Sequence, residues 1–286
     1  MTSSSPMSLN PDHPSHWNAL FHARADVSPF NQLNDLLSIS HLPDWPDADG
    51  LNRWVEALGV ATVPAFVDQD SLAQGLGYYE EIIASEGIIP TRSRNWHDLF
   101  NGIIWLLFPR TKALLNRLHM DDIAAHGVHP RTRRRNHITH FDECGVVLAV
   151  SDPSVPELMA EHQWRDALAN KREAWGNTIS PFVFGHANLE MLLTPHLSLT
   201  GKWLAVAVEN DFHQLPFAEQ CHQLDALLAS QLQQQQTFSQ PRPLRPLPLL
   251  GIPGFWPDNQ NPAFYDNTAV FRPKPTPPQT PPSGPR

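Results

Sequence analysis

The chain has 286 residues, of which 41% are hydrophobic and 29 are prolines, and it carries a formal net charge of −9. This composition is typical of a globular protein of one large or two small domains. It contains no apolar run of roughly eighteen residues, which excludes a membrane-spanning helix and a membrane partner. Two cysteines without metal-type spacing argue against a disulfide framework, and we expect a cytoplasmic protein.

The N-terminal third is predicted to be helical. Residues 1–16 are polar and contain no packing pattern, so we expect them to be disordered. Helices are predicted at residues 30–39, 49–58 and 70–87, the second ending at Gly59. The carboxylates of this region are typical of a solvated face.

The stretch of residues 92–145 contains most of the chain's local positive charge. Nine Lys and Arg residues against three Asp residues lie between Arg92 and Arg135, in a chain that is acidic as a whole. Such a basic island attracts an anion; a solvated arginine-rich loop remains the alternative. Because guanidinium forks match oxyanions, we predict that these basic residues bind substrate: Arg92, Arg94, Lys112, Arg134 and Arg135.

A core helix is predicted within this stretch. Ser93 is its expected N-cap, and residues 99–108 are apolar almost all round, which is typical of a buried helix. His97 and Asn101 lie four residues apart and therefore share one flank. We predict His97 and Asp98 as proton-transfer residues and Asn101 as a substrate-binding residue. Alternatively, His97 and Asn101 only bond to neighbouring backbone.

Pro109 is predicted to end this helix and to begin the next one. In the second helix Lys112, Asn116 and His119 are spaced four and three residues apart, so they form one polar stripe. Asn116 joins the predicted substrate-binding residues. Residues 119–135 are then predicted to be a connecting loop.

Two strands are predicted to follow at residues 137–141 and 146–151, joined by the sequence DECG at residues 142–145. Asp favours the start of such a turn and Gly its end. Asp142 and Glu143 beside a strand end suit a divalent cation or acid–base chemistry. The alternative is that Asp142 caps its own turn, and Glu143 alone is expected to point to solvent.

A helix at residues 155–175 and a strand at residues 179–184 are predicted next. Gly185 then opens a helix in which His186 and Glu190 lie four residues apart on one face. Such a pair presents an imidazole and a carboxylate to a metal, or lets the carboxylate orient the histidine. A local hydrogen bond at the start of the helix is the alternative.

The C-terminal part contains a predicted strand at residues 203–208 and a predicted helix at residues 217–236. Residues 241–273 alternate Pro, Gly and Asn with aromatic residues, which indicates an extended segment laid over the core and covering the pocket. Residues 273–286 are rich in proline and lack aromatic residues, so we expect a disordered tail.

Several strings resemble a bacterial family that is described as a domain of unknown function. They are NWHDLFNGIIWLLFPRTKALLN at residues 95–116, THFDECG at residues 139–145, FVFGHANLE at residues 182–190, and GIPGFW with FYDNTAVFRP in the C-terminal part. The resemblance covers roughly residues 30–272 and implies no particular activity. It leads us to expect an acidic residue where this chain has His137.

These patterns predict one mostly helical α+β domain at residues 17–272, with a small antiparallel sheet and a long irregular C-terminal segment. The polar side chains are expected to surround one cavity. The residues predicted to carry proton transfer are His97, Asp98, Asp142, His186 and Glu190. If a divalent metal is bound, its predicted ligands are Asp142, His186 and Glu190.

The leading functional hypothesis is an enzyme that acts on an anionic substrate, with a phosphate-bearing molecule as one option. One alternative is a non-catalytic module that binds nucleotides or RNA through the basic island. The other is a structural or interaction protein whose polar core residues have no chemical role.

Overall fold

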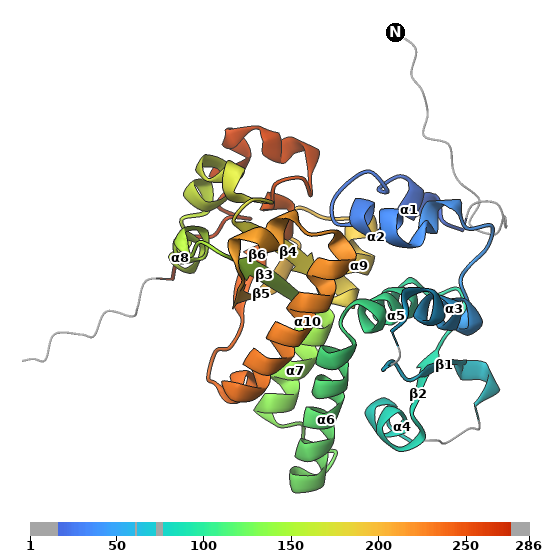
Figure 1. The fold of residues 1–286 in the computed structure, drawn as a ribbon. Coiled ribbons are helices and arrows are strands. Elements are labelled where there is room, and N and C mark those ends of the chain that lie inside the picture. The colour runs from blue at the N-terminus through green and yellow to red at the C-terminus, as the bar shows by residue number, and fades with distance from the viewer. Residues whose placement is uncertain (1–16, 61, 73–76, 276–286) are drawn as a thin grey trace, which may run out of the picture.

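The structure is a computed structural model that describes residues 17–60, 62–72 and 77–275 (Figure 1). The predicted disordered segment at residues 1–16 and most of the predicted tail lie outside the described residues. The first residues of that predicted tail are described, and Lys274 makes an ion pair with Glu161 at 2.7 Å.

The fold is mixed α+β and mostly helical, as the sequence predicts. The α-helices are α1 (Ala19–His22), α2 (Phe30–Leu37), α3 (Ala48–Leu58), α4 (Tyr79–Glu86), α5 (Trp96–Leu107), α6 (Pro109–His126), α7 (Arg133–Cys144), α8 (Ser154–Ala160), α9 (His186–Leu193) and α10 (Phe217–Gln234). The strands are β1 (Ala65–Asp68), β2 (Ile88–Thr91), β3 (Gly145–Val150), β4 (Ile179–Val183), β5 (Thr200–Ala207) and β6 (Arg245–Pro248).

The main sheet has four strands in the order β4-β3-β5-β6, with α7 and α10 packed against it (Figure 1). Every residue of β3 is buried. The sheet is mixed, whereas the sequence predicted an antiparallel one: β3 pairs in parallel with β5, and the other neighbours are antiparallel. The long connection through α8, β4 and α9 makes the parallel pairing possible. A separate parallel pair, β1 and β2, lies beside α3 and α4.

Helix α5 is the buried centre of the helical part and packs against α9, α6 and α3. All its residues from Leu99 to Leu107 are buried, as the apolar pattern predicts. Its N-cap is Asn95 rather than Ser93, because the Asn95 side chain accepts a hydrogen bond from the Asp98 N–H at 3.0 Å. Gly102 lets α3 approach, since a Cβ atom there would lie 2.8 Å from Leu51.

The predicted strand at residues 137–141 is wrong, because these residues lie in helix α7. Thr132 caps the helix by accepting a hydrogen bond from the Arg135 N–H at 3.1 Å. Arg135, Ile138 and Phe141 are its buried residues, and their spacing of three follows one helix face rather than the alternation of a strand. The predicted loop at residues 119–135 is correspondingly shorter, because α6 continues to His126.

The predicted helix at residues 155–175 is interrupted after α8. His162 has a φ of 57°, which a continuous helix does not tolerate, and a π-helical turn follows at Asp166–Asn170. The C-terminal segment packs here: the Trp164 indole donates to the Arg272 carbonyl oxygen at 2.7 Å, and Phe271 is buried.

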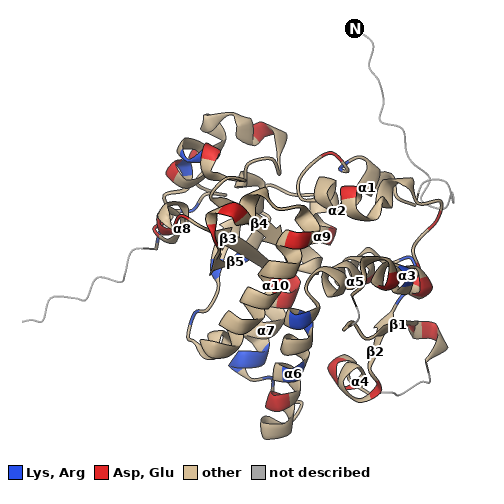
Figure 2. Ribbon diagram, viewed as in Figure 1, with Lys and Arg blue, Asp and Glu red and all other residues tan. Residues whose placement is uncertain are grey.

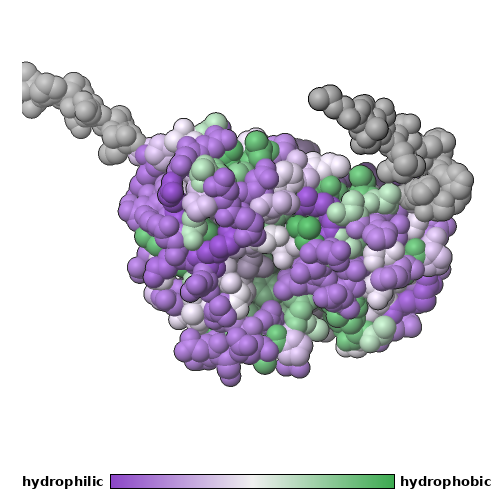
Figure 3. Space-filling model, turned by 90° about the horizontal axis from the view of Figure 1, so that it is seen from above, coloured by the Kyte–Doolittle hydropathy of each residue, from purple (hydrophilic) through white to green (hydrophobic). Residues whose placement is uncertain are grey.

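The face of the molecule seen in Figure 3 is mostly hydrophilic and has small separate hydrophobic patches. Exposed large hydrophobic side chains within the described ranges are Leu20, Met191, Leu197 and Leu227. None of the helices in the described part of the chain is both long and apolar enough to cross a membrane.

We expect Asp225 to stabilise the junction of α5, α6 and α10. Its carboxylate accepts the N–H groups of Arg110 and Thr111 at 2.9 and 2.8 Å, in the first turn of α6. Asp225→Ala leaves both donors without partners and should lower the free energy of unfolding by about 1–3 kcal/mol, measured by urea denaturation. Glu219→Ala, an exposed carboxylate on the same helix, is the control and should change it by less than about 0.5 kcal/mol. Equal effects of the two substitutions would contradict this role.

Candidate functional site

A cavity of about 300 Å³ lies between α4, α5, α7 and the start of α9. Its walls are mostly polar, and titratable side chains face it from every one of these helices. The titratable lining residues are Tyr78, Tyr79, Glu80, Arg92, His97, Asp98, Arg131, Asp142, Glu143 and His186. A concave site with convergent polar groups is where ligand binding is expected.

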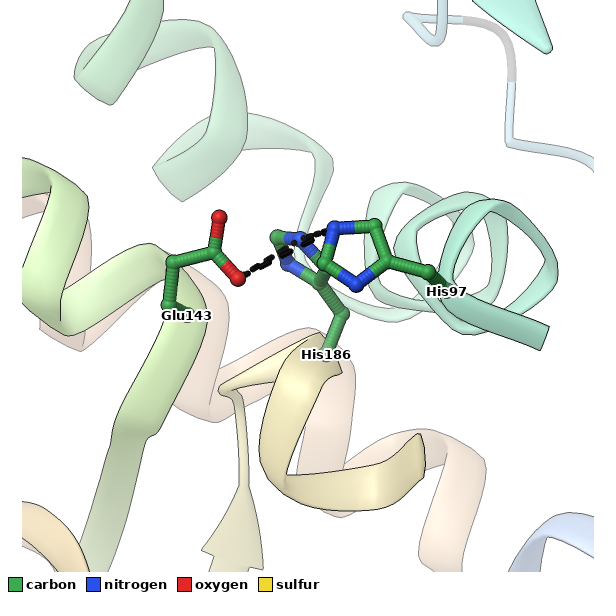
Figure 4. Close-up of side chains that lie close together, drawn as sticks. All are labelled: His97, Glu143 and His186. Atoms are coloured by element: carbon green, nitrogen blue, oxygen red, sulfur yellow. Dashed lines mark hydrogen bonds and ion pairs between the residues drawn. The ribbon is translucent and has the colours of Figure 1, made fainter. Parts of the chain in front are cut away.

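Three of these side chains point toward one another at one end of the cavity (Figure 4). His97 from α5 and His186 from α9 place their Nε2 atoms 3.0 Å apart. Glu143 from α7 places its Oε2 atom 3.4 Å from His186 Nε2 and 3.8 Å from His97 Nε2. One ligand atom from each of the three residues lies within 4.8 Å of the other two, so the cluster can hold a metal ion.

Each imidazole of this cluster has a carboxylate behind it. Glu190 Oε2 lies 3.1 Å from His97 Nδ1, and Asp142 Oδ2 lies 4.0 Å from His186 Nδ1. His186 Nδ1 is buried without a hydrogen-bond partner among the described residues. Carboxylates in these positions orient metal-binding histidines and raise their basicity.

Asp142 is fixed by a buried ion pair. Its Oδ1 atom accepts a hydrogen bond from Lys112 Nζ at 2.6 Å, and Lys112 also donates to Asn101 Oδ1 at 2.9 Å. Asn101 Nδ2 in turn donates to the Tyr79 hydroxyl at 2.9 Å. Burial alone would raise the pKa of Asp142, but the charge and hydrogen bond of Lys112 outweigh it and hold that pKa below its ordinary value.

Burial shifts the other titratable groups toward their neutral forms. It lowers the pKa of His186 to about 3 and that of His119 to about 4. It raises the pKa of Glu143 and of Glu80. Glu80 accepts a hydrogen bond from Asn116 Nδ2 at 2.7 Å on the α4–α6 side of the cavity. A neutral imidazole is the form that binds a metal.

The structure brings most of the predicted site residues together. The residues that line the cavity or bond to a lining residue are Arg92, His97, Asp98, Asn101, Lys112, Asn116, Asp142, His186 and Glu190. Of the predicted metal ligands, only His186 belongs to the three-residue cluster. Asp142 and Glu190 lie behind the imidazoles instead.

Three predicted anion-binding residues neither line the cavity nor form a hydrogen bond or ion pair with a residue that lines it. Arg94 is exposed and lies 3.8 Å from Asp44. Arg134 pairs with Asp122 at 2.8 Å. Arg135 is 1% exposed and donates to the Val128 carbonyl oxygen at 2.6 Å. We predicted from the sequence that the basic island forms one anion-binding site. However, helix α6 carries acidic as well as basic residues (Figure 2), and Asp122 of α6 neutralises the charge of Arg134 of α7.

The sequence-based prediction missed five titratable residues of the cavity lining: Tyr78, Tyr79, Glu80, Arg131 and Glu143. Glu143 was expected to point to solvent, but it faces the two histidines because α7 is a helix and not a hairpin. The predicted C-terminal covering segment also contributes no cavity-lining residue.

A family model described as "Protein of unknown function (DUF3025)" matches residues 64–275, which is more than half of the chain and includes the whole three-residue cluster. This match confirms the resemblance seen in the sequence. No curated protein and no solved structure matches the chain.

The buried neutral His186 predicts a loss of stability in acid. Its folded-state pKa of about 3 is below the ordinary value of about 6.5, so the unfolded chain binds a proton first as the pH falls. From pH 7 to pH 5 this should cost about 2 kcal/mol of the free energy of unfolding. His186→Gln should lose about that much less than the wild type, as measured by urea denaturation with a chelator present. An identical pH dependence in the two proteins would contradict the prediction.

Proposed function

The chain belongs to the DUF3025 family, and from this premise we propose that it is a metal-dependent enzyme that acts on a small anionic substrate in the cavity. In this proposal His97, Glu143 and His186 hold a divalent ion at one end of the cavity. The predicted reaction class is hydrolysis, and the predicted location is the cytoplasm, which the two free cysteines support.

The observation that carries the proposal is the approach of the two Nε2 atoms to 3.0 Å. His97 Nδ1 lies against the Glu190 carboxylate, so it bears the proton and leaves Nε2 with a lone pair. If His186 donates through Nε2, its bare Nδ1 faces the Asp142 carboxylate. If His186 carries its proton on Nδ1, two Nε2 lone pairs face each other.

In either neutral tautomer of His186, one of its nitrogen lone pairs therefore faces an acceptor: the Asp142 carboxylate in the first case and His97 Nε2 in the second. A second proton on His186 does not resolve this conflict near neutral pH, because burial lowers the pKa of His186 to about 3. A divalent ion held by His97, His186 and Glu143 would remove this conflict, because each histidine could then carry its proton on Nδ1, on the side of its carboxylate.

The ligand types indicate the class of ion. Two imidazoles and one carboxylate suit zinc, manganese or iron, whereas magnesium and calcium prefer oxygen ligands alone. Three protein ligands leave open positions, and the cavity lies beside them. A bound ion would supply Lewis-acid polarisation and a lowered pKa for bound water.

The chain's own residues would then position the substrate and manage protons. In hydrolysis the OH of one water joins the electrophilic atom of the substrate, and its remaining proton goes to the leaving group. Glu80 is a candidate proton donor, because burial raises its pKa and it faces the same cavity. Lys112 keeps Asp142 ionised and in place behind His186.

The nucleic-acid alternative has less support. It depends on a free basic island, but Arg134 is paired with Asp122 and Arg135 is buried. A purely structural role requires an added proton on His97 or Glu143 to remove the lone-pair conflict with His186, whereas a bound ion would remove it without one.

The metal prediction can be tested by elemental analysis and by calorimetric titration with zinc, manganese and magnesium. Wild-type protein should bind one zinc or manganese ion per chain, and Glu143→Gln and His186→Ala should abolish the binding. Glu190→Gln should weaken it by about 10- to 100-fold, because Glu190 acts through His97. The exposed Glu219→Gln is the control. Wild-type protein that binds no metal, or a Glu143→Gln variant that binds it equally well, would refute the site.

The enzymatic prediction needs its own assay. Metal-loaded protein should hydrolyse members of a panel of small phosphate and carboxylate esters, and both chelation and Glu143→Gln should remove that activity. Glu219→Gln should retain it. A metal-loaded wild type that turns over no member of the panel, while binding the same anions, would favour a binding module over an enzyme.

A further inference from the structure

We infer that Arg131 is the residue that recognises the anionic group of the substrate, and that this group is a phosphate or a carboxylate on a small molecule. The inference rests on the proposed function, because it assigns the specificity of the same cavity. Neither the sequence patterns nor the family match single out this arginine.

Arg131 is the cavity-lining cation that keeps its charge available. Of the three basic residues in or beside the cavity, Arg92 donates to both carboxylate oxygens of Asp98, at 2.7 and 3.0 Å, and Lys112 pairs with Asp142 at 2.6 Å. Within the described ranges, Arg131 has no carboxylate within 4.0 Å. It is exposed at the cavity wall.

The guanidinium of Arg131 is nevertheless held in place. One nitrogen, Nη2, donates to the Tyr78 hydroxyl at 3.1 Å and to Thr139 Oγ1 at 2.9 Å. Both acceptors are neutral, so they orient the group without cancelling its charge. A guanidinium has five N–H donors, and the three that remain, on Nε and Nη1, can donate single charge-assisted hydrogen bonds to the oxygens of a phosphate or carboxylate.

The supports of Arg131 are themselves fixed. The buried Arg135 guanidinium lies 5.7 Å from the centre of the Tyr78 ring, in cation–π contact. Thr139 lies one helical turn before Glu143 on α7, so the two side chains share one flank of that helix. Helix α7 therefore presents the Arg131 support and a proposed metal ligand to the same cavity.

The charge balance of the loaded cavity favours an anion. The Arg92–Asp98 and Lys112–Asp142 pairs are each neutral. Glu143 and Glu190 match the two charges of a divalent ion. Burial raises the pKa of Glu80, which favours its uncharged form. Arg131 is then the cavity-lining cation without an ion-pair partner among the described residues, with a longer-range attraction to Glu80, and it attracts one negative group.

The size of the cavity limits the class of substrate. A volume of about 300 Å³ accommodates a small molecule and not a folded macromolecule. The ion-binding cluster and Arg131 belong to the same lining, so one molecule can place its anionic group on Arg131 and its reacting bond at the ion. Phosphate and carboxylate are both oxyanions that accept hydrogen bonds from a guanidinium group.

The test is calorimetric titration of the full chain with inorganic phosphate and, separately, with acetate. Each titration is made with metal-loaded and with chelator-treated protein. Arg131→Ala should weaken binding of the preferred anion at least about tenfold. Arg131→Lys should recover part of the loss, because it keeps the positive charge but lacks the several N–H donors of the guanidinium. Arg133→Ala removes an equal charge from an exposed residue outside the cavity lining and should bind as the wild type does.

Comparing the two anions distinguishes the two classes of substrate. Tighter binding of phosphate indicates a phosphoester substrate, and tighter binding of acetate indicates a carboxylate substrate. Binding of neither anion, or equal binding by the wild type and Arg131→Ala, would overturn the inference. The metal titration of the same variants keeps the two proposals separate. All the arginine variants should bind the ion as the wild type does. A wild type that binds anion through Arg131 but binds no metal would refute the proposed metal site alone.

Discussion

The site depends on a close contact between the end of α7 and the start of α9. A Cβ atom at Gly185 would lie 2.5 Å from the Glu143 carbonyl oxygen and 2.6 Å from the Cα atom of Cys144, so a side chain does not fit there. The Gly185 N–H donates to the Gly145 carbonyl oxygen at 2.8 Å. The backbone contacts between α7 and α9 therefore place Glu143 and His186 close enough for their side chains to meet. His97 is added from α5, which packs against α9.

Much of the helical framework could be predicted, because its signals are local. The apolar run of α5, the break at Pro109 and the glycine before α9 each act over a few residues. Helix α7 could not be read this way. It buries only a narrow face, and the sequence DECG at its end has the composition of a turn. Because a hairpin was predicted there, the Glu143 side chain was expected to point to solvent and not into the site.

The hydrogen-bond and ion-pair partners within the site could not be predicted from the spacing of residues in the sequence. The four-residue spacing of His186 and Glu190 predicted a pair on one helix, but Glu190 bonds to His97, which is 93 residues distant. Likewise, the sequence shows that a run of arginines is positively charged, but it does not show which residues contact them in the folded chain. Asp122 neutralises Arg134 at 2.8 Å, and the chain buries Arg135. Several residues of the cavity could be predicted from the sequence, whereas their partners and the role of each one required the tertiary structure.

The proposed ion would be linked to the tertiary fold. Its three ligands come from α5, α7 and α9, and no two of them are near in sequence, so the unfolded chain has no preformed site. An ion that binds only the folded chain stabilises it by mass action. Within the cluster His186 is buried, and its Nδ1 atom has no hydrogen-bond partner among the described residues, which raises the free energy of the folded state. The Lys112–Asp142 pair and the contact at Gly185 hold the helices together against that cost, and thereby keep His97, Glu143 and His186 side by side.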